Sequence, residues 1–130
     1  MSKAPLVSVV EDDQFFRESM RRLMKSLSYS VEVFPSAADF VASPRLLETT
    51  CLIADVQMPV MSGLELHRSL IEAGYAIPTI LVTAYPNDID QARALKDGVV
   101  CYLRKPVDEK RLMQCIRTAL YSGEPSEENS

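Results

Sequence analysis

The sequence lacks several features that would assign it to common classes of protein. No apolar run approaches the roughly 18 residues of a membrane span. The start, MSKAPLVSVV, has neither a long apolar segment nor a small-residue cleavage site, so we expect no signal peptide and no membrane partner. Basic residues are also few, since 14 Lys and Arg against 18 Asp and Glu give a net charge of -4. This balance argues against direct nucleic-acid binding, which needs a basic patch, but leaves room for a short basic face.

Cysteine and histidine are scarce. Cys51, Cys101 and Cys115 are odd in number and far apart, and no CxxC pair exists, so a metal or redox motif is not expected. Each cysteine lies in an apolar context, where a free thiol behaves as a small hydrophobe. We therefore expect three reduced thiols and a cytoplasmic protein. The single histidine, His67, has no acid–base constellation around it in sequence and is expected to be an ordinary helix residue.

What the chain does have is enough apolar material for one domain. Its 130 residues are 47% hydrophobic and 25% charged, which suits a single globular unit. We place the domain at residues 1–122. The last residues, 123–130, read GEPSEENS and are polar and acidic, so they are expected to be a disordered tail or a truncated linker.

Apolar runs alternate with helical patterns along the domain. Strands are expected at residues 6–10, 31–34, 52–54, 80–82 and 99–103, and helices are expected to begin near residues 14, 36, 62, 86 and 108. This alternation indicates βαβ units and a buried parallel sheet. The predicted fold class is α/β: a flavodoxin-like, doubly wound, five-stranded parallel sheet in the order 2-1-3-4-5, with five helices on both faces.

Charged and hydroxyl side chains stand where the predicted strands end. Glu11 and Asp12 follow the first strand, Asp55 the third, Thr83 ends the fourth, and Lys105 follows the fifth. Because ligands bind outside the carboxyl ends of parallel strands, we expect these side chains to meet. Clustered carboxylates favour a hard cation such as Mg²⁺, and a lysine offers a charge for phosphate. This set suits phosphoryl transfer, with Asp55 as nucleophile and an aspartyl phosphate as product.

Four segments together identify a family. They are VVEDD (9–13), LIADVQMPVMSGLEL (52–66), ILVTAY (80–85) and CYLRKP (101–106). With these segments in this order, the chain resembles the receiver domain of bacterial two-component response regulators from about Leu6 to Leu120. The wording around Asp55 and the VTAY segment look most like FixJ-type receivers.

The resemblance implies a phosphorylation site and a Mg²⁺ site. Asp55 would be the phosphoacceptor and would also bind the metal. Asp12 would be a direct Mg²⁺ ligand, Glu11 a more indirect one, and Gln57 would contribute its backbone carbonyl. Glu11 departs from the family's usual Asp at this position. Its side chain is one methylene longer, which would alter the geometry or affinity of the metal site.

The resemblance also implies a switch. Thr83 and Lys105 would bind the phosphoryl group, the Lys105–Pro106 peptide would be cis, and Tyr102 would turn inward on activation. The fourth helix, fifth strand and fifth helix would form the surface that changes. Each residue also has an ordinary structural interpretation, since a lone Asp before a proline loop is most often a turn residue and Tyr102 could simply be packed. The joint placement of Asp55, Thr83 and Lys105 favours the functional interpretation.

The expected function is a phosphoprotein switch in phosphorelay signal transduction. A histidine kinase or histidine phosphotransfer protein would supply the phosphoryl group, and a downstream effector domain or protein would receive the signal, with a phosphorylation-dependent homodimer as a further partner. The chain would not be an enzyme beyond catalysing its own phosphorylation and dephosphorylation. Two alternatives stay open: an interaction module that is never phosphorylated, and a phosphatase of the haloacid-dehalogenase kind. The latter would need a second Asp where Gln57 stands.

Overall fold

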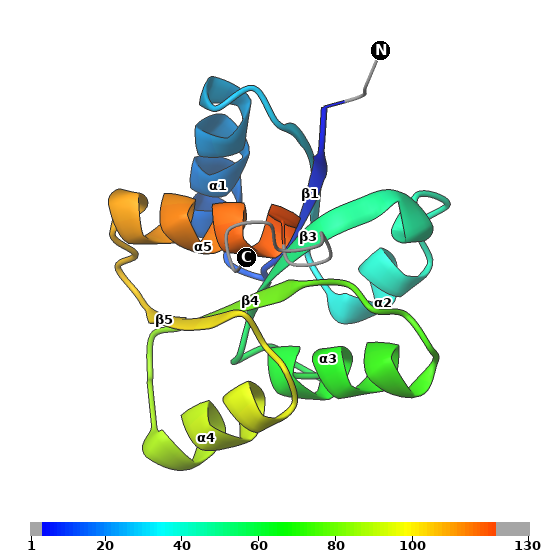
Figure 1. The fold of residues 1–130 in the computed structure, drawn as a ribbon, viewed down its shortest axis with the longest axis vertical. Helices are drawn as coiled ribbons and strands as arrows, with labels where there is room; N and C mark the ends of the chain where they lie inside the picture. The colour runs from blue at the N-terminus through cyan, green and yellow to red at the C-terminus, as the bar shows by residue number, and fades with distance from the viewer. Residues whose placement is uncertain (1–3, 122–130) are drawn as a thin grey trace, which may run out of the picture.

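Five parallel strands form one sheet in the order β2-β1-β3-β4-β5 (Figure 1), which confirms the predicted fold. The structure, a computed structural model, describes residues 4–121, so the predicted tail at 123–130 lies outside the described residues. The strands are β1 (Leu6–Val10), β2 (Ser30–Phe34), β3 (Thr49–Asp55), β4 (Thr79–Thr83) and β5 (Cys101–Arg104). Strands β1, β3 and β4 are almost wholly buried, as parallel strands covered on both faces should be.

Helices cover both faces of this sheet. They are α1 (Gln14–Ser26), α2 (Ala37–Val41), α3 (Gly63–Glu72), α4 (Asp88–Lys96) and α5 (Glu109–Tyr121). Figure 1 shows α1 and α5 on one side and α2, α3 and α4 on the other. Two cores result. One packs Met24 of α1 and Ile116 of α5 on the sheet, and the other packs Phe40 of α2 and Leu66 of α3 on the opposite face.

Side-chain caps fix where the helices begin. Asp13 accepts a hydrogen bond from the Phe15 amide and starts α1. Ser62 and Glu65 form the predicted capping box of α3, with both reciprocal bonds present. Such caps satisfy amides that lack a partner in the first turn of a helix. They place the helix N-termini beside the strand ends, where the candidate site lies.

Several element boundaries differ from the sequence prediction. Helix α4 begins at Asp88 rather than Pro86, because the Asn87 side chain caps it by accepting from the Asp90 amide. Strand β3 extends to Thr49–Asp55, and a short 3₁₀ helix at Leu46–Glu48 precedes it. Each difference lies at an element end, where hydrophobic periodicity carries little information.

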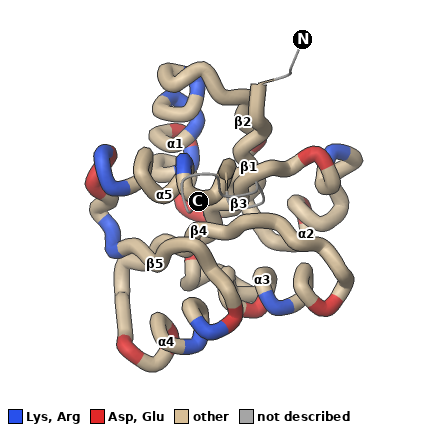
Figure 2. The backbone as a smooth tube through the Cα atoms, in the orientation of Figure 1, with Lys and Arg blue, Asp and Glu red and all other residues tan. Residues whose placement is uncertain are grey.

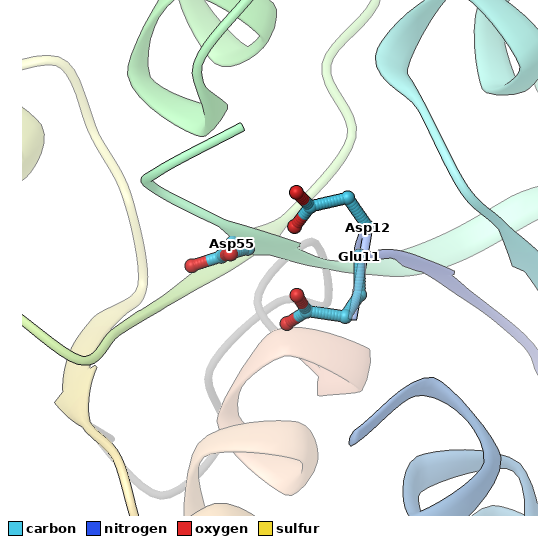
Figure 3. Close-up of side chains that lie close together, drawn as sticks. All are labelled: Glu11, Asp12 and Asp55. Atoms are coloured by element: carbon cyan, nitrogen blue, oxygen red, sulfur yellow. The ribbon is translucent and has the colours of Figure 1, made fainter. Parts of the chain in front are cut away.

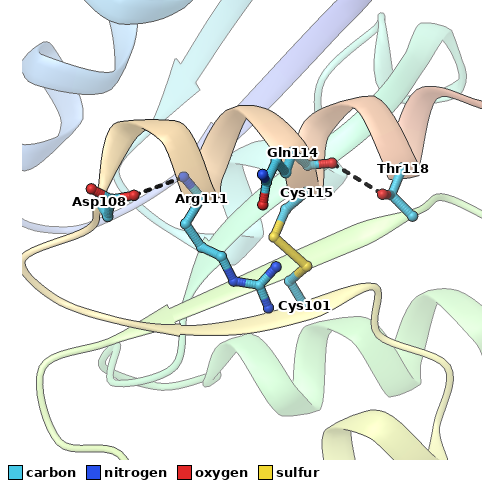
Figure 4. Close-up of a disulfide and its surroundings, with 6 residues drawn as sticks. All are labelled: Cys101, Asp108, Arg111, Gln114, Cys115 and Thr118. Atoms are coloured by element: carbon cyan, nitrogen blue, oxygen red, sulfur yellow. Dashed lines mark hydrogen bonds between the residues drawn. A yellow bond between two sulfur atoms is a disulfide. The ribbon is translucent and has the colours of Figure 1, made fainter.

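The expectation of three reduced thiols is wrong for two of them. Cys101 of β5 and Cys115 of α5 form a disulfide (Figure 4). Cys51 is free and buried. The two cysteines are 14 residues apart in sequence, and their Cα atoms lie 6.2 Å apart, within the range that a disulfide can span. The crossover from β5 to α5 turns the inner face of α5 onto the strand, and sequence spacing could not show this.

Charged residues are concentrated on the helices and connecting segments. Figure 2 shows Lys and Arg interspersed with Asp and Glu around the molecule, while the central strands carry almost no charge. Within residues 4–121, every helix is too short or too polar to cross a lipid bilayer.

Candidate functional site

Three carboxylates meet at the carboxyl edge of the sheet. Glu11 and Asp12 follow β1, and Asp55 is the last residue of the neighbouring strand β3. One oxygen from each lies within 4.8 Å of the others. Figure 3 shows the Glu11 and Asp12 carboxylates reaching from the end of β1 toward the side where Asp55 lies. Glu11 and Asp55 are buried, while Asp12 is exposed.

Lys105 supplies a balancing positive charge. It follows the edge strand β5, at the same carboxyl edge of the sheet. Its Nζ lies 2.8 Å from Glu11 Oε1 and 3.6 Å from Asp55 Oδ2. The Lys105 side chain is only 17% exposed, so water screens these pairs less than it screens surface ion pairs. The Asp13 amide donates to the second oxygen of Glu11 at 3.0 Å, and the Gln57 amide reaches Asp55 Oδ1 at 3.4 Å.

Burial dominates the protonation of the two inner carboxyl groups. Loss of water raises the pKa of Glu11 to about 7, even though Lys105 and the Asp13 amide act in the opposite direction. Burial also raises the pKa of Asp55, against the influence of Lys105. The cause is that a charged carboxylate is poorly solvated there. Burial thus disfavours the charged form of both carboxyl groups, and a cation bound beside them would favour it.

Thr83 is held by the side chain of Gln57, for which the sequence analysis predicted only a backbone contact with the metal. Its hydroxyl donates to the Gln57 side-chain oxygen at 2.6 Å and accepts from the Tyr85 amide at 2.9 Å. Thr83 ends β4 and is fully buried. The Gln57 side chain thus links the loop after Asp55 to the neighbouring strand end. The metal-binding role expected for the Gln57 carbonyl stays a prediction.

A close approach of helix α3 to strand β3 fixes the backbone around Asp55. The Gly63 amide donates to the Val56 carbonyl at 3.2 Å. A Cβ added at Gly63 would lie 2.5 Å from the backbone oxygen of Asp55, closer than van der Waals contact permits. Glycine is therefore required here by packing, and it lets the N-terminus of α3 sit directly against the end of β3.

The remaining predicted residues take ordinary positions. The Lys105–Pro106 peptide is cis, as the resemblance implied. Tyr102 is partly buried, and its hydroxyl accepts from the Asn87 amide at 3.3 Å, so it contacts the N-cap of α4. His67 is buried within α3, and burial lowers the pKa of its imidazole.

Two residues of α1 contribute to the site in ways that the sequence did not reveal. The Arg17 guanidinium donates to the Glu11 carbonyl at 2.8 Å. The ring of Phe16 lies 4.3 Å from Lys105 Nζ, measured to the ring centroid. Helical periodicity assigned Phe16 only to the apolar face of α1. Phe16 and Lys105 are far apart in sequence, so no local pattern could have predicted their pairing.

The residues present suit a hard divalent cation. Three carboxylate oxygens from Glu11, Asp12 and Asp55 lie close enough to share one ion, and oxygen ligands with a net negative charge are what Mg²⁺ prefers. Lys105 next to Asp55 adds a positive group for an incoming anion. The arrangement can therefore hold a cation and a phosphoryl group beside one nucleophilic carboxylate.

Comparison with known proteins agrees with this chemistry. The family model described as "Response regulator receiver domain" matches residues 7–117. The response regulator protein TmoT of Ectopseudomonas mendocina is 37% identical over 126 residues, covering 96% of this chain and 57% of TmoT. The response regulator protein TodT of Pseudomonas putida is 39% identical over 119 residues, covering 91% of this chain and 52% of TodT. The chain thus spans about half the length of the curated relatives it matches.

Solved structures show the same fold. The crystal structure of FixJ-N superposes with a TM-score of 0.82 at 26% identity, covering 96% of this chain and 99% of that one. This similarity agrees with the FixJ-type sequence motif noted around Asp55.

Proposed function

The chain belongs to the response regulator receiver domain family, and we propose that it accepts a phosphoryl group on Asp55 and thereby switches a signalling surface. Receiver domains of this family are signalling switches in two-component systems. One observation carries the assignment of Asp55: its carboxylate ends a buried strand 3.6 Å from the Lys105 ammonium, within the carboxylate cluster. Glu11 is equally buried and lies closer to Lys105, so the place of Asp55 in the receiver-like segment at residues 52–66 decides between the two carboxylates.

The proposed step is an in-line displacement at phosphorus. An Asp55 oxygen forms a bond to the phosphorus of a phosphohistidine on a histidine kinase or phosphotransfer protein, and the phosphorus–nitrogen bond breaks. The imidazole leaves and is protonated. Lys105 pairs with a phosphoryl oxygen, and the Thr83 hydroxyl donates to another. Positioning and charge neutralisation supply most of the catalysis in such reactions.

We propose that Mg²⁺ is held by Asp12 and Asp55, with Glu11 acting less directly and the Gln57 carbonyl as a further ligand. When bound, the ion neutralises negative charge on the phosphoryl oxygens. The chain's own part is to keep three oxygens within 4.8 Å of one another on two adjacent strands. This preorganisation supports the proposal, because rigid strand ends need little rearrangement to bind an ion.

Phosphorylation would add about -1.5 to -2 charge at Asp55 and draw the Thr83 hydroxyl toward the phosphoryl group. Thr83 is one residue before the loop whose Asn87 amide bonds to Tyr102, so its movement would reach the surface of α4, β5 and α5. Pro106 and Tyr102 would shift with that surface. A downstream effector or a second copy of the chain would read the change in the cytoplasm.

Labelling with acetyl phosphate tests this function. We expect the purified chain to incorporate one phosphoryl group in the presence of Mg²⁺, and chelation of Mg²⁺ with EDTA to abolish labelling. Asp55→Asn should remove labelling completely, whereas Asp39→Asn, an exposed carboxylate on α2, should leave it unchanged. Equal labelling of wild type and Asp55→Asn would refute Asp55 as the acceptor. Sustained turnover of a phosphate ester would instead favour the phosphatase alternative.

A further inference from the structure

The Lys105 ammonium lies against an aromatic ring as well as against carboxylates. Its Nζ is 4.3 Å from the centroid of the Phe16 ring, within the range of a cation–π interaction. Phe16 is in the first turn of α1, partly buried and packed against the core on that side of the sheet. The Lys105 side chain is 17% exposed. This desolvation strengthens the attraction between the charge and the ring.

The three partners of Lys105 differ in what happens to them during the proposed reaction. Glu11 and Asp55 attract Lys105 through their carboxylate groups. On phosphorylation Asp55 becomes an acyl phosphate, so it no longer carries its carboxylate charge. Glu11 and Asp55 also both lie in the set of oxygens that would face a cation. Their hold on Lys105 must therefore weaken as the phosphoryl group arrives. The Phe16 ring takes part in neither event, so its attraction for the ammonium persists throughout.

The ring also leaves the lysine free to bind phosphate. A π face attracts the cation by its quadrupole and uses none of the three N–H donors of the ammonium in a conventional hydrogen bond. Glu11 already engages one donor. The others can turn to phosphoryl oxygens while the ring keeps the ammonium in place.

We infer that Phe16 is a positioning residue for phosphoryl transfer. Its ring face holds the Lys105 ammonium beside Asp55 while phosphoryl oxygens replace the carboxylate partners of Lys105. The inference rests on the proposed function of Asp55. It assigns to α1 a role in the chemistry that goes beyond packing.

The neighbouring residue provides a matched control. Phe15 is also aromatic and also in the first turn of α1, but this residue is 88% exposed. The two positions share chemistry and helix context. They differ in whether the ring contacts Lys105.

The test replaces Phe16 with phenylalanines that carry one, two or three ring fluorines. Added fluorines weaken the quadrupole of the ring while nearly preserving its shape, so packing stays similar. The affinity for beryllofluoride at saturating Mg²⁺ is measured for each protein, together with the rate of labelling by acetyl phosphate. We expect a stepwise loss of affinity with each fluorine, reaching about five-fold for three fluorines and for Phe16→Leu. The same series at Phe15 should show no trend.

Each outcome decides a separate question. If wild type is labelled on Asp55 but affinity is flat across the Phe16 series, the positioning role is refuted. The same holds if the Phe15 series shows an equal trend. If wild type is not labelled and binds no beryllofluoride, the proposed function fails before the role of Phe16 is reached. Urea unfolding of each variant shows whether the loss follows stability instead of ring charge, and such a correlation would also refute the role.

Discussion

At the scale of single residues, the hydrogen bond between Thr83 and Gln57 is the contact most directly in competition with function. A threonine hydroxyl has one proton to donate, and Thr83 gives it to the Gln57 side chain at 2.6 Å. A phosphoryl group on Asp55 would need the same proton. By accepting this proton, the side-chain oxygen of Gln57 stabilises the arrangement that precedes phosphorylation.

Removing this competitor should favour the phosphorylated form. We expect Gln57→Ala to bind beryllofluoride about three- to five-fold more tightly, because a net hydrogen bond to the unliganded form is lost. Isothermal titration at saturating Mg²⁺ measures the change. Gln14→Ala, an exposed glutamine at the start of α1, should leave the affinity unchanged. Weaker binding by Gln57→Ala would mean that its side chain assists the phosphoryl group.

Gly63 begins helix α3 and allows that helix to approach the end of β3 closely. An alanine there would place Cβ 2.5 Å from the Asp55 carbonyl oxygen, and backbone cannot move aside as a flexible side chain can. We expect Gly63→Ala to lower the free energy of unfolding by about 1–3 kcal/mol and to slow Asp55 labelling by displacing the end of β3. Denaturant unfolding and acetyl phosphate labelling measure the two effects.

A control on the same helix separates packing from helix propensity. Ser69→Ala, an exposed position of α3, raises helix propensity as Gly63→Ala does but introduces no contact with β3. It should be neutral or slightly stabilising. Equal behaviour of the two variants would show that α3 moves freely away from Asp55.

At the scale of elements, the disulfide joins β5 to α5 within the proposed switching surface. It closes a loop between residues 14 apart in sequence, which stabilises a fold by about 3 kcal/mol in the chain-entropy account. Both cysteines belong to the core between α5 and the sheet. The disulfide therefore limits how far α5 can slide along β5 when the switch operates.

Reduction should reveal this constraint. We expect the denatured chain, isolated without reductant, to titrate one thiol, that of Cys51, and three after reduction. Reduction should also lower the free energy of unfolding by up to about 3 kcal/mol, measured by urea unfolding with and without a phosphine reductant. Cys101→Ala should be insensitive to reductant. Three titratable thiols before reduction would contradict the disulfide.

At the scale of the whole molecule, Glu11 couples folding to pH. Burial raises the pKa of its carboxyl from 4.5 to about 7, so between these values the folded chain keeps a proton that the unfolded chain has released. The stability contributed by this proton is fully present below pH 4.5 and is lost as pH rises through about 7.

We therefore expect stability without divalent cations to decrease with rising pH. In EDTA, the free energy of unfolding should fall by roughly 1–3 kcal/mol between about pH 5 and about pH 8, measured by urea unfolding. Glu11→Gln should remove most of this slope and leave the part due to Asp55, whose pKa burial also raises. Identical slopes in the two proteins would show that Glu11 is already ionised when buried.

The architecture of the whole molecule was largely predictable because its signals are local. Apolar runs, caps such as Asp13 and Ser62, and alternating periods each depend on residues within a few positions of one another. The gathering of strand ends at one edge follows from these elements once a parallel sheet is assumed, whereas the order 2-1-3-4-5 rests on the known flavodoxin-like arrangement. Boundaries such as the start of α4 were less accurate, because a single side chain, Asn87, decides them.

By itself, the sequence determined which side chains stand at the strand ends: Glu11, Asp12, Asp55, Thr83 and Lys105. Only the tertiary structure decided which partners they meet there. The Phe16 ring lies against Lys105, and the Gln57 side chain accepts a hydrogen bond from Thr83. Gly63 packs against the Asp55 backbone, and Cys101 pairs with Cys115. The physical reason is that hydrophobic period and capping act over a few residues. These contacts instead join segments separated by many residues, and they form only when crossovers and packing bring the segments within a few ångströms.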